Sequence, residues 1–109
     1  MTIEVGSVVI VHLGTPREQV FGLVLSLQQS GIVVRGMTLS SVDDWLRDIS
    51  GADGTTGASM GLTTTFYPMH RVEKVILDEP SFGAPGIEDR FRQRAGMSLA
   101  DFVGRGEGG

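Results

Sequence analysis

The sequence predicts a mostly β fold with added helices, in which five short strands curl into a small barrel. Three observations support this prediction. Residues 7–39 hold three β-rich segments in a row, a helical repeat follows them, and only three residues join two further β segments. Short strands joined by tight turns, with a helix packed on them, are typical of one small domain.

The composition is that of a globular domain. The chain has 109 residues, of which 40% are hydrophobic and 20% are charged, a balance that argues against wholesale disorder. Cysteine is absent, which excludes disulfides and thiolate metal sites and is consistent with a cytoplasmic location. Two histidines and scattered carboxylates show no ligand spacing, so we expect no metal and no cofactor.

The net charge and the lengths of the apolar runs indicate which kinds of partner to expect. The formal net charge is −4, which weighs against a non-specific nucleic-acid binder without excluding a local patch. The N-terminal segment lacks the early Lys or Arg of a signal peptide, and we expect none. No apolar run approaches the roughly 20 residues that span a bilayer, so we expect no membrane partner.

The first three strands form a predicted antiparallel meander. Their ranges are Ser7–Leu13, Gln19–Gln29 and Ile32–Leu39, and the first connection, Gly14–Glu18, has turn chemistry. Gly22, inside the second strand, predicts a bend or bulge. The alternation of Leu23, Leu25 and Leu27 predicts that these three side chains face the core.

A helix is predicted between the third and fourth strands, as an insertion over residues 40–50. Its apolar residues follow the helical spacing i, i+3, i+4, i+7 and are Val42, Trp45, Leu46 and Ile49. Ser41 and Asp44 have nearly the spacing of a capping box, and Gly51 is a candidate stop. Residues 51–61 are rich in glycine and read as a loop without phosphate-binding or calcium-binding spacing.

The fourth and fifth strands are predicted over Leu62–Pro68 and Arg71–Leu77. The three residues at the joint, 68–70, suit a tight corner resembling a 3₁₀ turn, where proline is tolerated because no ladder N–H is needed.

We divide the chain into a barrel over 1–79, a linker over 80–86, a C-terminal helical segment over 87–103 and a disordered tail over 104–109. Within the helical segment, Gly96 is predicted to end one helix and Ser98 to begin a second.

The segments "VGSVVIVHLGTPREQVFGLVLSL", "GIVVRGM" and "FYPMHRVEKVIL" together resemble the Sm-like (LSm) fold, and within it the bacterial Hfq-type RNA chaperone, over about residues 5–77. Tyr67 and His70 stand at places similar to the family's aromatic–basic–His corner, but Pro68-Met69 replaces the accompanying lysine. The resemblance implies a five-stranded SH3-like barrel. Its fourth and fifth strands would be exposed edges, which Sm-like proteins pair between subunits to close a ring.

Three sets of candidate residues follow. A ligand or RNA surface would comprise Tyr67, His70, Arg71 and Arg35; an oligomer edge would comprise Phe66, Val72 and Val75; and a partner-contacting helix would present Arg90 and Arg94. The alternatives are that His70 serves the structure of the corner and that Arg90 and Arg94 cover a solvated helix face.

The function hypothesis is a non-enzymatic, oligomerising Sm-like interaction module. The alternatives are an RNA-binding Sm-like ring and an accessory or regulatory subunit of an enzyme, with the glycine-rich loop as its contact. Nucleophilic catalysis has no support, because the sequence lacks a nucleophile elbow. The paired carboxylates Asp43 and Asp44 are explained by their place at a helix N-terminus.

Overall fold

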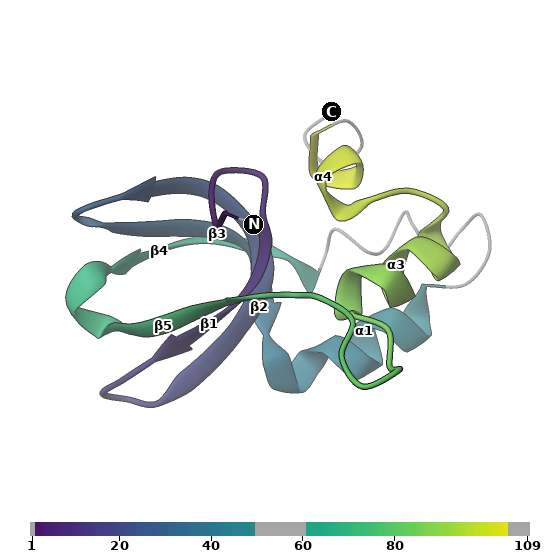
Figure 1. Ribbon diagram of the computed structural model, residues 1–109, viewed down its shortest axis with the longest axis horizontal. Coiled ribbons are helices and arrows are strands. Elements are labelled where there is room, and N and C mark those ends of the chain that lie inside the picture. Colours follow the sequence, from purple (N-terminus) through teal and green to yellow (C-terminus); the bar gives the residue numbers. More distant parts are fainter. Residues whose placement is uncertain (1, 50–60, 105–109) are drawn as a thin grey trace.

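The computed structural model describes residues 2–49 and 61–104 and shows a mostly β molecule with a few helices (Figure 1). The strands are β1 (Val8–Leu13), β2 (Glu18–Gln28), β3 (Gly31–Thr38), β4 (Thr63–Pro68) and β5 (Val72–Leu77). The helices are η1 (Leu39–Ser41), α1 (Val42–Asp48), η3 (Met69–Arg71), α3 (Ile87–Ala95) and α4 (Leu99–Phe102), where η marks a 3₁₀ helix. The predicted loop over 51–61 and tail over 104–109 lie outside the described residues, except for Gly61 and Gly104.

The five strands form one antiparallel sheet in the order β4-β3-β2-β1-β5. The predicted meander is confirmed, since β1 pairs with β2 and β2 pairs with β3. After β4 the chain returns to the far side of β1, so β4 and β5 lie at opposite edges of an open sheet. The prediction of five strands is confirmed, and closure of the sheet into a barrel stays a prediction.

Gly22 allows two strands to approach closely. It pairs in register with Gly36 of β3, and a Cβ atom at position 22 would lie 2.6 Å from the carbonyl oxygen of Arg35. Only glycine fits this approach of backbones. The pairing between β2 and β3 has no register shift at Gly22. The β-bulge that the sequence offers as one possibility at Gly22 is therefore located at another residue of β2.

The bulge in β2 lies at Leu25, where the register with β3 shifts between Val24 and Ser26. An extra residue reverses the side-chain phase of everything after it. Leu23 and Leu27 therefore lie on opposite faces, since Leu27 pairs with Ile32 on the same face as the Val24–Val34 pair. Leu23 is buried, while Leu25 and Leu27 are 36% and 38% exposed. The prediction that these three leucines share a core face was wrong for this reason.

The core consists of two clusters, one on each face of the sheet. The sheet cluster comprises Val9, Val11, Leu13, Val20, Val24, Ile32 and Val34. Tyr67 from one edge strand and Val75 from the other both pack against it. The sheet is curled, because the three residues of η3 alone join the two strands that lie at its opposite edges.

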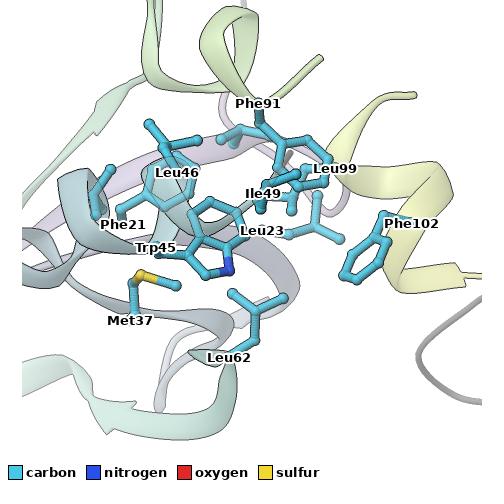
Figure 2. Close-up of a cluster of buried hydrophobic side chains, with 12 residues drawn as sticks. Phe21, Leu23, Met37, Trp45, Leu46, Ile49, Leu62, Phe91, Leu99 and Phe102 are labelled. Atoms are coloured by element: carbon cyan, nitrogen blue, oxygen red, sulfur yellow. The ribbon is translucent and has the colours of Figure 1, made fainter. Parts of the chain in front are cut away.

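The helix-side cluster joins the other face of the sheet to α1, α3 and α4 (Figure 2). It comprises Val8, Phe21, Leu23, Met37, Val42, Trp45, Leu46, Ile49, Leu62, Phe91, Leu99 and Phe102. The four residues of the predicted helical stripe all belong to it. The C-terminal helices therefore pack on their own chain, and β2 is buried on both faces from Val20 to Val24.

The entry into α1 differs from the predicted capping box. Ser41 makes no side-chain cap, and its Oγ lies 3.0 Å from Oγ1 of Thr38. The reason is η1, which brings Ser41 into helical backbone angles (φ −92°, ψ −9°) before α1 begins, whereas a capping residue usually has extended angles. The helix ends at Asp48, and Gly51 lies outside the described residues.

The C-terminal helices have the predicted punctuation. Gly96 ends α3 in the left-handed conformation (φ +79°), and the Oγ of Ser98 accepts a hydrogen bond of 3.0 Å from the N–H of Asp101 at the start of α4. The predicted linker contains a tight turn, in which Ser81 and Ala84 form an isolated antiparallel bridge.

Candidate functional site

The corner between β4 and β5 crosses from one part of the sheet to another. Pro68 ends β4 with extended angles, and η3 follows it directly. The N–H of Met69 donates to the carbonyl of Ser30 at 2.9 Å, and the N–H of Gly14 donates to the carbonyl of Arg71 at 2.8 Å. The corner is therefore fixed at both ends by backbone hydrogen bonds, with the proline placed where it breaks none of them.

Arg71 holds the turn between β1 and β2. Its Nε donates to the carbonyl of Gly14 at 3.2 Å, and its Nη2 donates to the carbonyl of Pro16 at 2.9 Å and to Oε1 of Glu18 at 3.1 Å. The Arg71 side chain is only 23% exposed. These three bonds commit the guanidinium to the fold, so we assign Arg71 a structural role.

The other three residues of the predicted ligand surface do not converge. Tyr67 packs against the sheet cluster, whereas Arg35 extends along the opposite face and donates from Nη1 to Oγ1 of Thr64 at 3.3 Å. His70 is exposed on η3. Side chains on two faces and a corner do not form a shared surface for one ligand.

Arg90 and Arg94 connect α3 to α1. Arg90 forms an ion pair of 3.1 Å with Asp43, and Nη1 of Arg94 lies 3.5 Å from the carbonyl oxygen of Ile49. This supports the alternative that the two arginines belong to a docked helix face.

A depression of about 270 Å³ lies between the start of β2 and η1. Its lining residues are Arg17, Glu18, Gln19, Thr38, Leu39 and Ser40. Glu18 already pairs with Arg71, and the remaining charge in this lining is the single guanidinium of Arg17. Such a sparse polar set does not define a chemistry.

The β4 edge is uncharged and exposes a large aromatic side chain. β4 carries no charged residue, and its side chain at Phe66 is 54% exposed. Phe66 pairs across the strands with Val33, and its ring lies over the backbone of Gly31, where a Cβ atom would approach the ring carbon Cε1 to 2.6 Å. The ring is thus held against the sheet with one side open to solvent.

Val72 and Val75 of the predicted oligomer edge both lie on β5, an edge strand of the sheet. Val72 and Val75 are half-buried against the sheet cluster, so they are core residues as well as edge residues. Ile76 points to the other face and is 41% exposed. Sequence reasoning missed Ile76, although its alternation with Val75 and Leu77 was a usable signal.

Comparisons with family models, with curated proteins and with solved structures gave no match for this chain. In the parts of the chain that the structure describes, no helix has the length and apolar character needed to traverse a lipid bilayer.

Proposed function

We propose that this protein is a non-enzymatic interaction module that associates with copies of itself through the edges of its sheet. The observation that carries the proposal is that each edge strand exposes a large apolar side chain, Phe66 on β4 and Ile76 on β5. The resemblance to Sm-like proteins gives the same expectation, with a curled barrel as the subunit and a ring as the assembly.

Unpaired backbone groups on the two edge strands explain why the sheet would associate with a second copy. An edge strand presents N–H and C=O groups that no neighbouring strand satisfies, and it readily pairs with another strand. Pairing would also remove part of the Phe66 and Ile76 side chains from water, and full burial of such a side chain is worth roughly 1.5–3 kcal/mol. Both terms favour association.

The RNA-binding alternative loses support. Arg71, one of its two predicted cations, is held by the turn between β1 and β2, and Arg35 lies on a different face from Tyr67. The net charge of −4 opposes binding to phosphates. Edge pairing requires none of these cations.

The test is the mass of the protein in solution, measured by size-exclusion chromatography with light scattering over a range of concentrations. We expect the wild type to exceed the 11.6 kDa of one chain and the double variant Phe66→Lys/Ile76→Lys to return to that mass, because a lysine at an edge opposes strand pairing.

Val5→Lys is the matched control, since Val5 is 62% exposed and lies outside the strands. This control should keep the mass of the wild type. A wild type that stays monomeric at every concentration would refute the proposal.

A further inference from the structure

Building on the proposed self-association, we infer that two copies pair β4 against β4 around a two-fold axis, rather than β4 against β5 in a ring. The partner is a second copy of this chain, and the contact is isologous, with the same strand contributed by each copy. The inference comes from the unequal chemistry of the two edges.

The β4 edge is regular and uncharged. Its six residues pair with β3 one to one from Thr63↔Gly36 to Pro68↔Gly31, without a register shift. Its exposed positions hold threonines and Phe66. An uncharged edge of β-branched and aromatic residues without a register shift is the kind of edge that accepts another strand.

The β5 edge carries features that oppose pairing. Its register with β1 shifts at Glu73, because Leu13 pairs with Val72 and His12 with Lys74. Glu73 and Lys74 are exposed. A bulge and a lysine are the devices by which natural sheets keep an edge from pairing, so a ring would have to use the poorer of the two edges.

A two-fold axis between two paired β4 strands is compatible with the alternation of side chains between the two faces of the sheet. Directly opposite residues in an antiparallel pair point to the same face, so Phe66 must lie opposite Thr64, Phe66 or Pro68 of the second copy, the β4 residues that share its face. Each of these registers places the two aromatic rings near each other on one face, either directly opposite or as diagonal neighbours. A pair of this kind uses the β4 edge of each copy once and is closed, as in most homodimers.

Single cysteines test this arrangement, because the chain has none of its own. Under mild oxidation, Thr65→Cys or Phe66→Cys should form a symmetric intermolecular disulfide. The rate should be roughly tenfold or more above that of the exposed control Val5→Cys, since a formed interface raises the effective thiol concentration towards millimolar. Ile76→Cys alone should crosslink no faster than the control.

The outcomes separate this inference from the proposed function. Light scattering should show twice the mass of one chain, reduced twofold by Phe66→Lys and unaffected by Ile76→Lys. If the wild type associates but a mixture of Phe66→Cys and Ile76→Cys crosslinks between the two variants, or if Ile76→Lys also dissociates it, the two-fold pairing is refuted and edge association stands. A monomeric wild type would refute both.

Discussion

At the scale of single residues, Phe82 stands out because it combines two costs. It has a positive φ of +52° at a turn in which Gly83 also has a positive φ (+80°), and its side chain is fully exposed. Two hydrogen bonds between Ser81 and Ala84 close the turn, at 3.0 and 2.9 Å. Two central residues with positive φ are the signature of a type I′ turn, which favours Asn-Gly. A bulky residue is disfavoured there.

We therefore expect Phe82→Asn to stabilise the protein by about 1 kcal/mol, since asparagine tolerates the left-handed conformation that other residues pay for. Urea denaturation measures this change. Phe82→Ala is the matched control, because it removes the exposed ring and keeps the unfavourable backbone, and it should leave the free energy of unfolding nearly unchanged. A loss of stability in Phe82→Asn would show that the aromatic ring contributes to the fold.

Arg71 shows how a candidate ligand-binding side chain can instead hold the fold together. A cation beside a histidine and an aromatic residue was a reasonable candidate for binding phosphate. Its actual partners, the carbonyls of Gly14 and Pro16 and the carboxylate of Glu18, lie more than fifty residues away in sequence. An arginine has five donors, and their acceptors can come from any turn that the fold brings near.

At the scale of elements, two carboxylates hold the C-terminal helices in place. Asp78, directly after β5, accepts hydrogen bonds from the N–H groups of Ile87 (2.8 Å) and Glu88 (2.7 Å) at the start of α3. Glu88 in turn accepts from the N–H of Leu99 at the start of α4 (2.9 Å). Each of these two helices is thus capped by an acidic residue that precedes it in the chain, which satisfies donors that a helix cannot satisfy itself.

Asp78→Ala should lower the free energy of unfolding by about 1 kcal/mol, the usual cost of losing an N-terminal cap. Hydrogen exchange should accelerate at the amides of Ile87 and Glu88, which lose their acceptor. The matched control is Glu79→Ala, an exposed neighbour that should change neither quantity. Unchanged exchange at these two amides in Asp78→Ala would contradict the capping role.

At the scale of the whole molecule, the sheet and the C-terminal helices share one core. Trp45 of α1 stacks on Phe91 of α3 with ring centroids 5.1 Å apart, and Phe21 of β2 lies 6.2 Å from Trp45 on the other side. Phe102 of α4 meets Phe91 edge-on at 5.6 Å. This aromatic row (Figure 2) connects β2 to α1, α3 and α4, so sheet and helices should unfold together.

Phe91→Ala should reduce the free energy of unfolding by about 3–5 kcal/mol, the usual cost of deleting a buried phenylalanine. Trp45 is the only tryptophan, so its fluorescence reports directly on the contact during urea denaturation. Gln93→Ala, at an exposed position of the same helix, is the control and should have little effect. A Phe91→Ala protein as stable as the wild type would show that α3 does not contribute to the core.

Much of the fold was predictable because its signals are local. The spacing of Val42, Trp45, Leu46 and Ile49 predicted α1, Gly96 predicted the end of α3, and the three residues at 68–70 predicted a 3₁₀ corner close to the observed η3. In each case the residues that determine the conformation lie within one or two turns of each other. Propensity and capping act at that range.

Burial within the candidate site is harder to predict because it is not local. Val72 and Val75 lie on the edge strand β5, as the predicted oligomer edge requires, but their side chains also pack on the sheet cluster, and the exposed apolar residue of the strand is Ile76. The face of β5 that points inward depends on its register with β1, which includes a bulge at Glu73. One residue of shift exchanges the two faces.

Local patterns were enough to predict the elements and their order, because alternation, helical spacing and turn residues act over a few neighbouring positions. Three other properties follow from the way the chain packs: β4 and β5 lie at opposite edges, β2 is buried on both faces, and Arg71 bonds to a distant turn. These properties arise from contacts between residues far apart in the chain. Such contacts depend on strand register and on which helix covers which face, and no local pattern encodes either.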